Sequence, residues 1–142
     1  MTKKVLVWLD GPYGYIHYGI SRHLSNLDDF EYYGMVSYQR DMEFYEQQNK
    51  LPFKELHYYP KYYIENSSKP DLEYLSQFEE KYSIELWKLA KNDRIFFKYN
   101  MYYNFSENEI LSILEQQCRF FENIIETIKP DFVIFPLTNS GR

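Results

Sequence analysis

Two runs of apolar residues, one near each end of the chain, set the pattern for the whole sequence. KVLVWL at 4–9 and DFVIFP at 131–136 are apolar at nearly every position. An unbroken apolar run of this length is typical of a strand buried on both faces of a parallel sheet. Two further strands are expected at 30–37 and 53–59, where aromatic and aliphatic residues gather between polar segments.

The segments between these strands have the periodicity of helices. In the segment 15–27, four apolar residues recur at spacings of four, four and three, which places them on one face of a helix: Ile16, Ile20, Leu24 and Leu27. A longer helix is expected to start at Ser106, because Ser106 and Glu109 have the spacing of a capping box, and to end at Lys129-Pro130. A short polar helix or a loop is expected at 39–50, shorter helices after Pro70 and around Trp87, and a loop at 60–70.

Strands that alternate with helices predict one α/β domain over residues 1–142, with a mostly parallel sheet of about four strands. The expected strand order is 3-2-1-4, with helices on both faces, as in a Rossmann-like three-layer sandwich. This order makes the first and fourth strands neighbours. DGPYGYIH at 10–17 and PLTNSGR at 136–142 should therefore lie side by side at the carboxyl edge of the sheet.

The composition narrows the classes of partner. A net charge of -5 without a basic cluster argues against nucleic acid. No apolar stretch has the length of a membrane span, and a single cysteine, Cys118, falls in a helical stripe where a core position is expected. A cytoplasmic location is expected, with peripheral attachment to the inner face of a membrane left open. The 16 Tyr and 11 Phe predict half-buried rings at element edges, in a groove or against a partner.

The turn after the first strand holds the first candidate site. Gly11, Tyr13 and Gly14 lie between a strand and a helix start, where free N–H groups favour an anionic or hydroxyl-rich ligand. The turn matches neither GxGxxG nor GxxxxGK[ST], and Pro12 removes one amide. Two interpretations stay open: a substrate-binding turn, or a tight corner between strand and helix.

The second candidate is a general base. His17 falls in the first turn of the expected helix, where the helix dipole favours the neutral imidazole that a base requires. Asp10 is a candidate to orient it. The alternatives are a helix histidine bonded to nearby backbone, and an aspartate that caps the turn.

Three small polar residues after the last strand complete the expected site. Thr138, Asn139 and Ser140 are suited to hold hydroxyls or a phosphate, or else to cap a following helix. Three scattered histidines and one cysteine give no recognised spacing of metal ligands, so no metal is expected.

Two phrases carry a family resemblance: LWKLAKNDR at 86–94, and the capped helix that runs into IKPDFVI at 128–134. They resemble the amino-terminal part of capsule- and surface-polysaccharide biosynthesis proteins, which are similar to glycosyltransferases of the two-domain GT-B type. The resemblance implies a metal-independent hexosyltransferase whose first domain shapes the acceptor side of a cleft. It implies that a second domain binds the donor, a nucleotide sugar, and that this chain is the incomplete first domain, inactive alone. It assigns Gly11 and Gly14 to the cleft and His17 to the acceptor-side base.

Two other functions stay open at this point. One is a non-catalytic module that binds a nucleotide or a sugar at the same edge. The other is an interaction domain that pairs, through its tyrosine-rich surface, with a second domain or with a second copy of itself.

Overall fold

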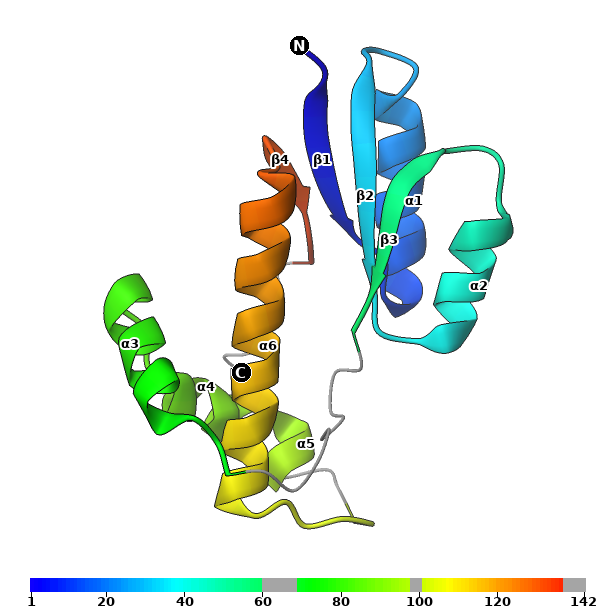
Figure 1. Cartoon of the computed structure of the whole chain (residues 1–142). Coiled ribbons are helices and arrows are strands. Elements are labelled where there is room, and N and C mark those ends of the chain that lie inside the picture. The colour runs from blue at the N-terminus through cyan, green and yellow to red at the C-terminus, as the bar shows by residue number, and fades with distance from the viewer. Residues whose placement is uncertain (60–68, 98–100, 137–142) are drawn as a thin grey trace. The chain divides into compact units, whose positions relative to one another are not determined.

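The computed structural model describes residues 1–59, 69–97 and 101–136 (Figure 1). The elements, in chain order, are β1 (Lys3–Trp8), α1 (Gly11–Leu24), β2 (Phe30–Val36), α2 (Gln39–Gln47), β3 (Phe53–Tyr58), α3 (Leu72–Tyr82), α4 (Leu86–Asn92), α5 (Arg94–Phe97), α6 (Glu107–Ile128) and β4 (Phe132–Ile134). They form two compact units. The first unit holds the four strands, α1, α2 and the last residues of α6 from Ile124, and the second holds α3, α4, α5 and the rest of α6.

The sheet of the first unit is parallel throughout, in the order β3-β2-β1-β4. Val5 lies between Tyr32 of β2 and Phe132 of β4, so the first and last strands are hydrogen-bonded neighbours. Asp131 fixes this register from outside the strand: its backbone N–H donates to Lys4 O (2.9 Å), and its Oδ2 accepts from Lys4 N (2.8 Å). The predicted strand order is confirmed.

Both faces of β1 are buried, as its apolar run predicts. Successive side chains of a strand point to opposite faces. Val5 and Val7 share one face and pack in a cluster with Tyr45 of α2 and with Leu51. Leu6 points to the other face and is also buried. The sheet is therefore flanked by helices, and the predicted Rossmann-like α/β sandwich is confirmed.

Helix α1 differs from its prediction in its start and in its buried face. The helix begins at Gly11, with Pro12 in its first turn, so the glycine segment expected as a turn before the helix is helical. Proline suits this place because its missing N–H would have no partner in the helix. The residues that α1 buries are Gly14, His17 and Ser21. Three of the four apolar residues expected on one face are instead exposed, at 58% for Ile16 and 45% for Ile20, with Leu27 beyond the helix at 69%, and Leu24 is half-buried.

A close contact between α1 and the end of β1 explains this inversion. A Cβ added at Gly14 would lie 2.2 Å from Leu9 O and 2.3 Å from the carbonyl carbon of Leu9. Ser21, two helical turns after Gly14, is buried, and its hydroxyl donates to His17 O (2.8 Å). The helix face toward the strand has room only for small or hydrogen-bonded side chains, and the bulky aliphatic ones point outward.

The second unit has a core of its own, in which apolar residues of α3, α4 and α6 meet. Its capping box is formed as predicted: Glu109 Oε2 accepts from Ser106 N (2.7 Å), and Ser106 Oγ accepts from Glu109 N (3.3 Å). Cys118 is buried in this core, and burial raises the pKa of its thiol to about 11. The thiol is therefore protonated at neutral pH, as befits a core residue.

Glu122 of α6 ties α3 to α6 on the surface of the second unit. Its carboxylate accepts from Tyr74 OH (2.7 Å), Lys81 Nζ (2.9 Å) and Tyr82 OH (3.0 Å). The hydrogen bond from Tyr74, followed by that from Lys81, holds the pKa of the Glu122 carboxyl below its ordinary value. A carboxyl whose pKa is lowered on folding stabilises the fold above its ordinary pKa, and this contribution is lost as the pH falls through the lowered value.

Two alanine substitutions in α1 test the close contact. Gly14→Ala is expected to lower the free energy of unfolding by about 1–3 kcal/mol, because the new methyl group meets backbone that cannot move aside. The methyl group of Gly19→Ala, in the same helix, meets no atom of the described residues within 4 Å. It should raise the free energy of unfolding by about 0.5–1 kcal/mol, the helix preference of alanine over glycine. Urea unfolding of both variants measures the difference, and changes of the same sign and size would contradict the contact.

Candidate functional site

The carboxyl ends of β1, β2 and β3 meet at one carboxylate. Asp10 follows β1, Ser37 follows β2 and Tyr59 follows β3. Asp10 Oδ1 accepts from Ser37 N (2.6 Å), and its Oδ2 accepts from Ser37 Oγ (2.8 Å) and Tyr59 OH (3.3 Å). We call these three residues the carboxylate junction. It joins the ends of three neighbouring strands through charge-assisted hydrogen bonds, which are stronger than neutral ones.

The junction changes the interpretation of Asp10. The residue occupies the N-cap position of α1, but among the described residues its side chain makes no capping hydrogen bond, so the alternative of an aspartate that caps the turn is wrong. In the described residues, the Asp10 carboxylate bonds to Ser37 and Tyr59, whereas His17 bonds to Trp8. Asp10 thus acts on the site by fixing the strand ends.

His17 is held by the backbone of β1. The side chain is buried, and its Nδ1 lies 2.6 Å from Trp8 O. A carbonyl oxygen only accepts, so Nδ1 carries the hydrogen in this contact, and the neutral ring keeps its lone pair on Nε2. This is the backbone-bonded histidine that the sequence left open as an alternative. The same tautomer leaves Nε2 as the atom that would act as a base.

A second carboxylate occupies the amino end of α1. Gly11 has a φ of +55°, a conformation that favours glycine. Its N–H donates to Asp41 Oδ2 of α2 (3.2 Å). Asp41 is only 1% exposed, and its Oδ1 accepts no hydrogen bond from the residues that the structure describes, with Arg40 Nε 3.9 Å away. The partial positive charge that a helix start offers to an anion is thus already matched by the protein's own carboxylate.

The position of Asp41 disfavours phosphate binding at the expected substrate-binding turn. A phosphate at the start of α1 would lie against the buried charge of Asp41, and Pro12 supplies no N–H. Gly14 N donates to Asp10 O (3.0 Å) as part of the helix, and the absence of a side chain there serves the packing on Leu9. The geometry of Gly11 and Gly14 therefore favours the tight corner over a phosphate-binding loop.

Two tyrosine rings next to the junction remain largely exposed. Tyr13 of α1 is 60% exposed, and Tyr38, which follows Ser37 in the chain, is 58% exposed. The neighbouring Trp8 and Tyr59 rings meet edge to face, with centroids 5.5 Å apart. The edge of the sheet thus combines exposed aromatic faces with a fixed carboxylate.

The remaining predicted residues, Thr138, Asn139 and Ser140, lie outside the described part of the chain. Sequence reasoning missed Ser37, Tyr59 and Asp41. For Ser37 and Tyr59 a signal existed, since each is a polar-tipped residue at the carboxyl end of an expected strand, 30–37 and 53–59, as Asp10 is just after the first strand. Asp41 gave no such signal, because one acidic residue in a polar helix is ordinarily solvated.

Comparisons with models of protein families, with curated proteins and with solved structures found no match. In the described ranges, no helix combines the length and the apolar character needed to cross a membrane. Nor do the described residues bring three or more His, Cys, Asp or Glu side chains together in a way that would hold a metal ion.

A double-mutant cycle tests the junction. Asp10→Ala is expected to lower the free energy of unfolding by about 2–3 kcal/mol, because it leaves the Ser37 donors without their charged acceptor. Ser37→Ala should cost about 1 kcal/mol, since the backbone N–H still reaches Asp10. The double variant should lose less free energy of unfolding than the sum of the losses in the two single variants, because both substitutions break the same hydrogen bond.

The matched control for this cycle is Asp29→Ala, an exposed aspartate in the loop before β2, which should change the free energy of unfolding by less than about 0.5 kcal/mol. Urea denaturation measures the free energy of unfolding of the two single variants, the double variant and this control. Strictly additive effects of Asp10→Ala and Ser37→Ala would show that the junction does not couple the strands.

Proposed function

We propose that the first unit is the acceptor-side domain of a glycosyltransferase of surface-polysaccharide synthesis, and that the carboxyl edge of its sheet binds the sugar acceptor. The proposal joins the family resemblance of the sequence to the Rossmann-like sheet and its edge. In open α/β sheets, ligands bind outside the carboxyl ends of the strands, where the strand order reverses. Here that point lies between β1 and β4.

The observation that carries the proposal is the exposure of Tyr13 and Tyr38 beside the carboxylate junction. A folded domain gains by burying large aromatic rings, and rings left exposed at a sheet edge are suited to a ligand. The faces of tyrosine rings pack well on the C–H groups of sugars. Their hydroxyls, with the junction, offer partners to sugar hydroxyls.

The carboxylate of Asp41 favours an uncharged acceptor over a phosphate-bearing ligand on this unit. Its negative charge already occupies the amino end of α1, where a nucleotide phosphate would otherwise bind. The nucleotide sugar would accordingly be held by a second, donor-binding domain, as the resemblance implies.

In the proposed transfer, an acceptor hydroxyl attacks the anomeric carbon of the donor sugar. The bond from that carbon to the donor phosphate breaks, and the nucleotide leaves with the bonding electron pair. His17 would take the hydroxyl proton at Nε2, while Trp8 O holds Nδ1–H and so keeps the ring in the required tautomer. Asp10 would keep the strand ends, and with them the start of α1, in place.

Saccharide binding by the unmodified chain tests the proposal. A titration of the 15N-labelled protein with neutral oligosaccharides should shift the amide signals of residues 10–17 and 37–38. Tyr13→Ala and Tyr38→Ala should each weaken binding about threefold to tenfold, as expected for the loss of one aromatic contact. Tyr102→Ala removes an exposed ring from the second unit and should leave binding unchanged.

Two results would decide against the acceptor role. Shifts at residues 10–17 with a nucleoside diphosphate, and none with neutral saccharides, would favour the nucleotide-binding module. Signals unmoved by either ligand, together with concentration-dependent self-association in light scattering, would favour the interaction domain.

A further inference from the structure

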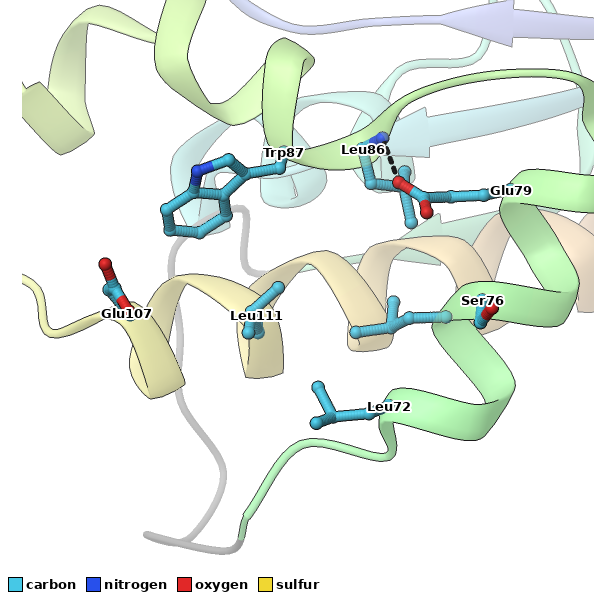
Figure 2. Close-up of a pocket in the computed structure, with 8 residues that line it drawn as sticks. Leu72, Ser76, Glu79, Leu86, Trp87, Glu107 and Leu111 are labelled. Carbon is cyan, nitrogen blue, oxygen red and sulfur yellow. Dashed lines mark hydrogen bonds between the residues drawn. The ribbon is translucent and has the colours of Figure 1, made fainter.

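The second unit contains a groove that the proposed function does not use. It has a volume of about 370 Å³ and lies between α3, α4 and α6 (Figure 2). The middle of the groove is apolar: Leu72 of α3, Leu86 of α4 and Leu111 of α6 line it, and the Trp87 indole lies above Leu111 in the view of Figure 2. An apolar interior of this size suits the body of a small organic molecule.

Two carboxylates stand at the two ends of this apolar stretch. Figure 2 shows Glu107 at one end and Glu79 at the other, with Trp87 and Leu111 between them. Among the described residues that line the groove, none is a lysine or an arginine. The groove is therefore negative at both ends and apolar in between.

The Glu79 carboxylate is fixed by the backbone. Its Oε1 accepts from Leu86 N (2.6 Å), at the start of α4, and this bond holds the side chain against the groove. In the described part of the chain, Oε2 accepts no hydrogen bond from another residue. One oxygen thus serves the fold, and the other is available to a ligand.

From this pattern we propose that the groove binds a linear aliphatic diamine, in its doubly protonated form. One ammonium group would donate to Glu79 Oε2 and the other to Glu107, and the methylene chain between them would lie on the leucines and the indole. An ammonium has three donors and no acceptor, so a carboxylate is its natural partner. An indole face next to the chain adds attraction for a cation.

The charge pattern favours a diamine over the other simple occupants. An anionic ligand would face two carboxylates. A neutral apolar ligand would fill the middle of the groove but leave both carboxylates without a partner. A monoamine would match one end only. A diamine of suitable length matches both ends together, so affinity should depend on the separation of its two charges.

Calorimetric titration of the full chain with diaminobutane, diaminohexane and diaminooctane tests the proposal. One length should bind at least threefold more tightly than the others, and the alcohol analogues, hexanediol and octanediol, should bind more weakly than the diamines of equal length. Binding should weaken as salt is raised, since exposed charge pairs are screened. The Trp87 indole signal in NMR spectra should shift on binding.

Variants that remove one carboxylate charge at a time test the two ends of the groove separately. Glu79→Gln keeps an oxygen to accept from Leu86 N, so the fold is retained while the charge is lost. Glu79→Gln and Glu107→Gln should each weaken the best diamine by about fivefold, the upper end for an exposed ion pair. The control is Glu80→Gln, which removes the same charge from the next position of α3, outside the groove.

Three results would overturn the proposal. The first is the absence of heat and of a Trp87 shift with every diamine. The second is an equal loss of affinity in Glu80→Gln, which would show a general attraction of cations to an acidic chain. The third is diol binding as tight as diamine binding, which would show an apolar cavity without charge recognition. Circular dichroism of each variant confirms that the helices are intact.

Discussion

The close approach of α1 to the carboxyl end of β1 is the constraint on which the edge of the sheet depends. Gly14 gives the helix room against the backbone of Leu9, and His17 bonds to Trp8 O from the same helix face. Because the side chains on this face must be small, Ile16 and Ile20 of α1 lie on its outer, exposed side. One steric requirement thus sets the position of the candidate base, the buried face of the helix and an exposed apolar stripe.

Two aspartates, Asp10 and Asp41, accept the backbone hydrogen bonds at this edge of the sheet. Asp10 binds the ends of three strands together, and Asp41 matches the positive end of α1 from a buried position. Each accepts from backbone N–H groups at places where the chain leaves regular pairing, which relieves the cost of burying a carboxylate. The consequence is electrostatic: the edge already carries its own anions, and aromatic faces and hydroxyls are what it presents to a ligand.

In the second unit, carboxylates link the helices to one another. Its helices meet around a core in which Cys118 behaves as a small apolar residue, and Glu122 links α3 to α6 at the surface. Glu79 plays the matching role inside, where it joins α3 to the start of α4. This bridge uses only one oxygen of Glu79, so the carboxylate still makes its end of the groove acidic, and Glu107 of α6 makes the other end acidic.

The sequence by itself determined the four strands, their order and the capped helix α6, because apolar runs, helical periodicity and the Ser106–Glu109 pair are local signals that packing did not override. It also pointed to Asp10 and His17. Only the tertiary structure decided what these residues contact. The buried face of α1 depends on the backbone of Leu9, which leaves no room for a Cβ at Gly14. The partner of Gly11 is Asp41, thirty positions away in the chain. Such contacts leave no periodicity in the sequence, since they arise where two elements meet in space.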